Sequence, residues 1–70
     1  MAEQIEKTYT VTGMTCEHCV NAVRSEVQAL DGVAAVRVDL ATGQVVVSGA
    51  GFTDAAVAAA VDEAGYSVAP

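Results

Sequence analysis

The chain has 70 residues, of which 53% are hydrophobic and 17% are charged, a balance typical of one small folded domain rather than a disordered segment. Its formal net charge is −6, with three basic residues. This charge argues against binding to nucleic acids or anionic membranes, which require clustered Lys and Arg. A partner protein with a basic docking patch would suit it, although the same charge also serves solubility alone.

The sequence contains no segment typical of export or of a membrane span. Residues 1–7 lack a basic stretch followed by an apolar one, so no signal peptide is expected. No run approaches the roughly 18 apolar residues of a spanning helix. Two cysteines are too few for a disulfide-stapled secreted scaffold. We therefore expect a single domain over residues 1–70, without membrane insertion, in the reducing cytoplasm.

Residues 5–12 alternate between polar and apolar side chains, which predicts a half-buried strand that ends at Gly13. Lys7 is the off-pattern residue of this strand. Its inward positions are expected to be Ile5, Tyr9 and Val11. From residue 17 the apolar period becomes helical. The predicted helical stripe comprises Val20, Val23, Val27 and Leu30. Gly32 is expected to end this helix in the left-handed conformation.

Residues 33–40 return to strand alternation, and a hairpin turn at residues 41–43 leads to a partner strand at residues 44–48. The inward positions of these two strands are expected to be Val36, Val38, Leu40, Val45 and Val47. Val46 is expected on the opposite side, either exposed or against a second packed face. Residues 49–51 are predicted to form a loop.

Thr53 is a good N-cap for a second helix, and Asp54 in its first turn suits the positive end of the helix dipole. The predicted apolar stripe of this helix comprises Val57, Ala60, Val61 and Ala64. Gly65 is expected to end it, and residues 66–69 are predicted to form a short last strand. The order strand, helix, strand, strand, helix, strand predicts the α+β class. We expect a ferredoxin-like βαββαβ sandwich, with a four-stranded antiparallel sheet and two helices on one face.

The most informative residues are two cysteines at the junction of the first strand and the first helix. Cys16 is expected in the loop or at the cap, and Cys19 in the first helical turn. Two intervening residues allow both sulfurs to reach one small volume. The unpaired N–H groups and the dipole at a helix start favour thiolates, so the pKa of the cysteines should fall. Thiolates are the ligands of soft metals.

The number of ligands indicates which metal fits. A structural zinc site requires four ligands, whereas this chain offers two cysteines and one histidine. His18 lies between the cysteines, and a helical turn would aim its ring away from the sulfurs. Two thiolates suit Cu(I), a soft ion that accepts low coordination. Such a site stays open to a third thiolate, which allows transfer by ligand exchange.

Five further residues are candidates for supporting roles. Met14 is expected to plug the core beneath the loop, with thioether ligation as the alternative. His18 is expected to be exposed and to tune the thiols, with metal ligation in a dimer as the alternative. Thr15 either positions the loop through its hydroxyl or has no role. Gly13 is expected to serve a tight turn. Tyr66 either shields the thiols or donates a hydrogen bond near them, or simply packs.

The stretch Gly13-Met14-Thr15-Cys16-Glu17-His18-Cys19 resembles the GMxCxxC motif of the heavy-metal-associated (HMA) domain family. Ala64-Gly65-Tyr66 is similar to the loop near the metal in bacterial members, and the likeness is greatest to CopZ-type bacterial copper chaperones. This resemblance covers essentially the whole chain. It implies Cu(I) bound by Cys16 and Cys19 and delivered to the N-terminal domains of a copper-transporting P-type ATPase.

The same resemblance implies further properties. Some family members give copper to a copper-responsive repressor, and bacterial members form a dimer around shared copper, with a monomer expected in its absence. We therefore predict a cytoplasmic copper chaperone in copper homeostasis, not an enzyme. The alternatives are a mercury-binding scavenger, a detached metal-binding domain of a P-type ATPase, and a thiol oxidoreductase. Thioredoxin-like oxidoreductases need a longer chain and usually carry Trp or Pro around the cysteine pair, which this chain lacks.

Overall fold

The structure is a computed structural model that describes residues 4–69. Six elements follow one another in the predicted order. They are β1 (Ile5–Thr12), α1 (Glu17–Gln28), β2 (Val33–Asp39), β3 (Gln44–Gly49), α2 (Asp54–Glu63) and β4 (Ser67–Val68). Within the described residues, neither helix is long and apolar enough to cross a membrane.

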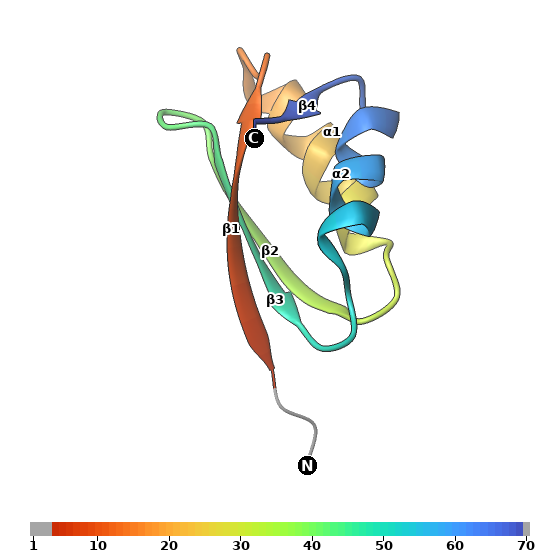
Figure 1. The fold of residues 1–70 in the computed structure, drawn as a ribbon. Coiled ribbons are helices and arrows are strands. Elements are labelled where there is room, and N and C mark those ends of the chain that lie inside the picture. The colour runs from red at the N-terminus through yellow and green to blue at the C-terminus, as the bar shows by residue number, and fades with distance from the viewer. Residues whose placement is uncertain (1–3, 70) are drawn as a thin grey trace.

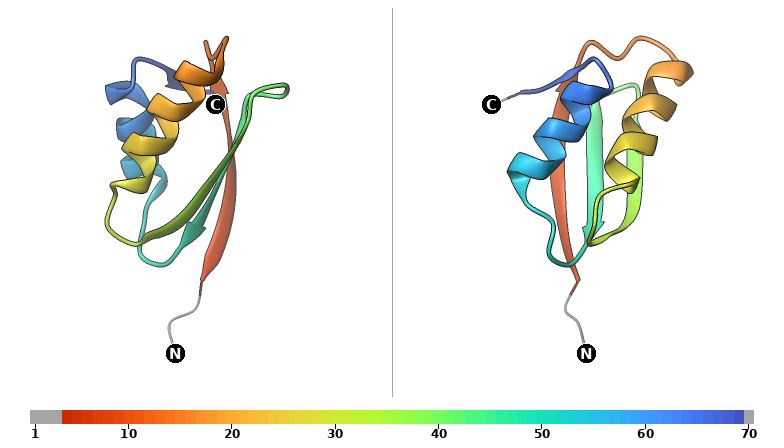
Figure 2. Two further views of the ribbon diagram at one scale, coloured as in Figure 1. Left: turned by 180° about the vertical axis from the view of Figure 1, so that it is seen from behind. Right: turned by 90° about the vertical axis from the view of Figure 1, so that its right-hand side faces the viewer.

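The four strands form one antiparallel sheet in the order β2-β3-β1-β4. Both helices cover the same face of this sheet, and β1 and β3 lie at its centre (Figures 1 and 2). The described part of the chain leaves the other face uncovered. The predicted ferredoxin-like sandwich is therefore confirmed.

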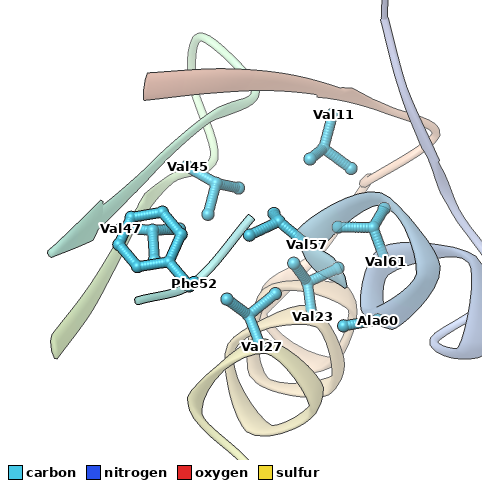
Figure 3. Close-up of a cluster of buried hydrophobic side chains, with 9 residues drawn as sticks. All are labelled: Val11, Val23, Val27, Val45, Val47, Phe52, Val57, Ala60 and Val61. Carbon is cyan, nitrogen blue, oxygen red and sulfur yellow. The ribbon is translucent and has the colours of Figure 1, made fainter. Parts of the chain in front are cut away.

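The core between the helices and the sheet is built largely from valine (Figure 3). Its fully buried side chains are Val23, Val27, Val45, Val47, Val57 and Val61, and Val11, Phe52 and Ala60 complete the cluster. The strand and helix periodicities had predicted all of these except Phe52. Phe52 directly precedes the N-cap Thr53, and Val57 lies in the first turns of α2. This spacing is that of a hydrophobic staple, which fixes how the chain enters the helix.

The end of α1 differs from the prediction. The helix stops at Gln28, and its C-cap is Ala29 in a right-handed conformation, so Gly32 is not the cap. Gly32 does have a φ of 88°, but the reason is a close approach to the loop after β3. A Cβ at position 32 would lie 2.3 Å from the carbonyl oxygen of Ala50. Leu30 is half-buried beyond the helix rather than on its stripe.

Other deviations lie at the ends of the sheet. Ile5 and Leu40 were expected to face inward, but they are 44% and 37% exposed. Ile5 begins β1, and Leu40 lies just past the end of β2, where the strand has already given way to the hairpin turn. Gly49 belongs to β3 rather than to the following loop. The last strand is shorter than predicted and comprises only Ser67–Val68.

The off-pattern Lys7 has a specific contact. Its Nζ donates to Asp54 Oδ1 at 3.0 Å, and the Tyr9 hydroxyl donates to the same oxygen at 2.7 Å. Burial and this hydrogen bond raise the pKa of Tyr9 to about 12. The contacts join β1 to the first turn of α2, where Thr53 caps the helix by accepting from the Ala56 N–H at 3.1 Å. Because the ion pair is exposed, it contributes little stability.

Truncation of the valine core should be costly, because the cavity adds to the lost transfer free energy. Val23→Ala is expected to lower the free energy of unfolding by about 2 kcal/mol in urea denaturation. Val46→Ala is the matched control, since Val46 is half-buried on the uncovered face of the sheet, and it should cost less than about 1 kcal/mol. Equal losses for the two variants would contradict this account of the core.

Candidate metal centre

The two cysteines lie at one end of the molecule, which carries three of its connections. These are the loop between β1 and α1, the β2–β3 hairpin turn, and the connection from α2 to β4 (Figure 1). The hairpin is tied to this end by a hydrogen bond of 2.7 Å from the Val11 N–H to the Gly43 carbonyl. The connection between β1 and α1 spans only residues 13–16. A short connection between two packed elements leaves the cysteine loop little freedom.

Cys16 is the N-cap residue of α1, and Cys19 lies in its first turn. The Cys16 carbonyl accepts hydrogen bonds from the Cys19 and Val20 N–H groups, at 3.1 and 3.2 Å, which starts the helix. The Cys16 side chain makes no capping bond, so its sulfur is not used by the helix. Backbone hydrogen bonds therefore define the start of α1 and leave both thiols available.

The two sulfurs point into one small volume. Cys16 Sγ and Cys19 Sγ are 3.5 Å apart, and both cysteines are free thiols. Cys16 is exposed and Cys19 is half-buried, so both sulfurs can be reached from outside. The pair is neither splayed apart nor hidden beneath the core. The predicted convergence of the two thiols is present in the structure.

Hydrogen bonds stabilise the thiolate of Cys19. The backbone of Thr15, the Tyr66 side chain and the Cys16 side chain, in this order, outweigh slight desolvation and lower the pKa of the Cys19 thiol to about 6. The direction is that expected for a cysteine at a helix start, but the largest cause is the backbone of the preceding loop. This lowering favours the thiolate form of Cys19 at pH 7, which is the form that binds metals.

Tyr66 lies over the cysteine loop. A Cβ at Gly13, whose φ is 94°, would lie 3.3 Å from Tyr66 Cδ1, so the ring packs beside the bare glycine backbone. The Tyr66 N–H donates to the Val61 carbonyl at 3.1 Å, which fastens this residue to the end of α2. Its hydrogen bond to Cys19 raises the pKa of the Tyr66 hydroxyl. Tyr66 thus packs beside the cysteine loop, and its effect on the Cys19 thiol stays a prediction.

The other predicted site residues take different positions. Thr15 Oγ1 lies 3.9 Å from Cys19 Sγ, at the outer limit of a hydrogen bond to sulfur. Met14 is half-buried and packs against the core cluster, as expected of a plug beneath the loop. His18 is exposed on α1. Among residues 4–69, no three His, Cys, Asp or Glu side chains gather into a set that could hold a metal ion.

The hydroxyl of Tyr66 is expected to affect the pKa of the Cys19 thiol. Tyr66→Phe should raise the pKa of the Cys19 thiol, because the variant removes the second-largest cause of its lowering. The pKa is read from the pH dependence of iodoacetamide alkylation, resolved for each cysteine by mass spectrometry. Tyr9→Phe is the control, because it removes a phenolic hydroxyl far from the thiols. It should leave the pKa of the Cys19 thiol near 6. A shift of equal size in both variants would refute the role of Tyr66.

Comparison with known proteins agrees with this geometry. Residues 8–67 match the heavy-metal-associated domain. The copper chaperone CopZ of Bacillus subtilis is 46% identical over 66 residues, which cover 91% of this chain and 96% of CopZ. Copper-transporting ATPase 2 of Rhizobium meliloti is 38% identical over 64 residues, 90% of this chain but 8% of the ATPase.

The solved structure of a CopZ metallochaperone superposes with a TM-score of 0.89 at 33% identity, covering 93% of this chain and all of that one. The matched region contains both cysteines, the core and both helices. These likenesses confirm the resemblance indicated by the residues from Gly13 to Cys19. The chain belongs to the heavy-metal-associated domain family.

Proposed function

We propose that this chain is a cytoplasmic copper chaperone that holds one Cu(I) ion between Cys16 and Cys19 and passes it to a copper-transporting P-type ATPase. The observation that carries the proposal is the pair of accessible sulfurs 3.5 Å apart at the start of α1. The chain performs no covalent chemistry in this role. Copper is its cargo rather than a catalytic cofactor.

The donor set favours a soft ion of low coordination number. Two thiolates form the site, and His18 and Met14 lie elsewhere, on the exposed surface and against the core. Thiolate ligands select Cu(I) over hard cations. Two thiolates on opposite sides of an ion lie roughly 4.6 Å apart if each metal–sulfur bond is about 2.3 Å, as for zinc. The pair would open by about 1 Å from its present separation to hold the ion in this way.

Exposure of the site explains how copper leaves. Cys16 lies at the exposed edge of the pair and Cys19 is half-buried, so a thiolate of a partner can approach from the open side. The incoming sulfur forms a bond to copper before one of the two cysteines releases it. The ion is then never free in water. Hydrogen bonds from the Thr15 backbone and Tyr66 stabilise the Cys19 thiolate when copper departs.

The partner is proposed from the likeness to the ATPases. A segment similar to nearly the whole chain lies within a copper-transporting ATPase, so donor and acceptor would present similar thiol pairs. Exchange between such pairs has a small free-energy difference and runs in either direction with the supply of copper. The net charge of −6 favours an acceptor domain with a basic surface.

Removal of both thiols should abolish copper retention. The double variant Cys16→Ser, Cys19→Ser should fold as the native chain does. It should lose Cu(I) to a colorimetric chelator at chelator concentrations at which the native chain keeps the ion. Met14→Leu is the matched control, because it removes the nearby thioether and preserves the core, and it should retain copper. Unchanged retention in the double serine variant would refute the site.

Direct transfer can be separated from release. The Cu(I)-loaded chain is mixed with the N-terminal domain of a copper ATPase and excess of a chelator too bulky to enter the thiol pair. Copper should appear on the domain, measured by native mass spectrometry, faster than on the chelator. If the chelator captures the ion first, the chain releases copper rather than handing it over. Tighter retention of Hg(II) than Cu(I) together with failed transfer would favour the mercury scavenger.

A further inference from the structure

The two edges of the sheet are very different. β4 forms one edge and comprises two residues, whereas β2 forms the other edge and comprises seven. An edge strand exposes unpaired backbone N–H and C=O groups, which are a template for pairing with another chain. Proteins usually protect long edges with proline, lysine, a bulge or a covering segment. β2 is therefore the edge at which further strand pairing can occur.

Protection of β2 is confined to its first half. The pairing with β3 shifts register between Val33 and Ala35. This irregularity makes the first part of the edge unsuitable for regular pairing with another strand. Register is regular from Val36 to Asp39, and this part contains neither lysine nor proline. Leu40 follows directly after the strand. It is one of only two large hydrophobic side chains that are exposed among the described residues. The second half of β2 thus combines a regular edge with an exposed apolar side chain.

The charges on this segment are also available. Among the described residues, the one ion pair joins Lys7 and Asp54, so Arg37 has no carboxylate within 4 Å. Asp39 accepts one hydrogen bond, from the Ala41 N–H at 3.0 Å, through Oδ1. Both side chains line an open groove of about 480 Å³ on the second half of β2 and the facing part of β3. The chain itself leaves these two opposite charges accessible.

We propose that the β2 edge binds a second copy of this chain through antiparallel β2–β2 pairing centred on Val38. In this register Arg37 of each copy lies opposite Asp39 of the other, which gives two pairs of opposite charges. Val36 lies beside the partner's residue that follows the strand, Leu40, so this exposed leucine gains an apolar neighbour. Cross-strand pairs of both kinds stabilise antiparallel sheets.

Neighbouring registers are less favourable. Pairing centred on Arg37 or on Asp39 places two identical charges opposite each other, which is destabilising. Pairing centred on Val36 would include the register shift at Val33 and Ala35 and would place Arg37 opposite an alanine. The centre at Val38 avoids the irregular half of the strand. Self-complementarity about one residue is what a two-fold symmetric partner requires, so the partner is a copy of the same chain.

The association is independent of the thiol pair and of copper. It uses the edge of the sheet, whereas the thiols lie at the start of α1. Each copy carries a net charge of −6, so general repulsion opposes the dimer and makes it weak. At low protein concentration the chain is then expected to be a monomer, and the dimer forms at high protein concentration. Moderate salt screens the general repulsion more than the close charge pairs, and it should strengthen association.

Sedimentation equilibrium of the reduced, metal-free chain up to millimolar concentration tests the proposal. The native chain should dimerise, and Arg37→Asp should weaken dimerisation by about tenfold, because it replaces two attractive pairs with repulsive ones. Arg24→Asp is the matched control: it makes the same charge change on the outer surface of α1, where Arg24 contacts Asn21. The double variant R37D/D39R exchanges the two charges and should recover dimerisation.

A second measurement does not depend on how the variants fold. In the native chain, amide NMR shifts of residues 36–40 should change with protein concentration, while those of α1 and of the cysteine loop should not. A native chain that stays monomeric at millimolar concentration would overturn the proposal. Equal weakening by R37D and R24D would also overturn it, because the effect would then come from net charge alone.

Discussion

The short connection between β1 and α1, residues 13–16, is the constraint on which the geometry of the two cysteines depends. β1 is fixed at the centre of the sheet, and α1 is fixed by Val23 and Val27 in the core, so the loop between them has two rigid anchors. Gly13 supplies the positive φ that begins the loop, and Cys16 ends it with extended backbone as the N-cap. This geometry brings the two sulfurs together at an exposed surface as free thiols, 3.5 Å apart and not joined by a disulfide.

The rest of the fold supports that loop from two directions. Met14 packs down against the core cluster, and Tyr66 packs from the end of α2 beside Gly13. The staple between Phe52 and Val57 sets the entry of α2, and the hydrogen bond from Tyr66 to the Val61 carbonyl sets its exit. A carrier site of two flexible thiols thus depends on a rigid frame, which reduces the conformational entropy lost when an ion binds.

Periodicity predicted the architecture because it reports which face each side chain occupies. Val45 and Val47 lie two positions apart on one face of β3, and Val57 and Val61 repeat at helical spacing, so their burial follows from the local pattern. The cysteine spacing at a strand–helix junction likewise predicted the convergence of the sulfurs, since both residues belong to one short segment. The number and softness of the ligands indicated Cu(I), and the family resemblance added the expected partner.

Features that join distant segments were not predictable in this way. Lys7 and Asp54 are 47 positions apart, and nothing in either local sequence indicates that they meet. The close approach of Gly32 to Ala50 likewise depends on how two loops cross. Leu40 matched the strand alternation but lies beyond the point where β2 ends, because periodicity does not locate the last residue of a strand. The leading role of the Thr15 backbone at Cys19 required the three-dimensional loop.

The valine core has a consequence for the lifetime of the protein. The fully buried side chains of the core are six valines, and each of them buries only a modest apolar area. A folded chain of 70 residues therefore has only a small free energy of unfolding. An ion that binds only the folded state adds to this free energy by mass action. On the proposed function, the empty carrier unfolds more often than the loaded one and is degraded sooner by intracellular proteases. Turnover would then match the amount of carrier to the supply of cargo without a dedicated sensor.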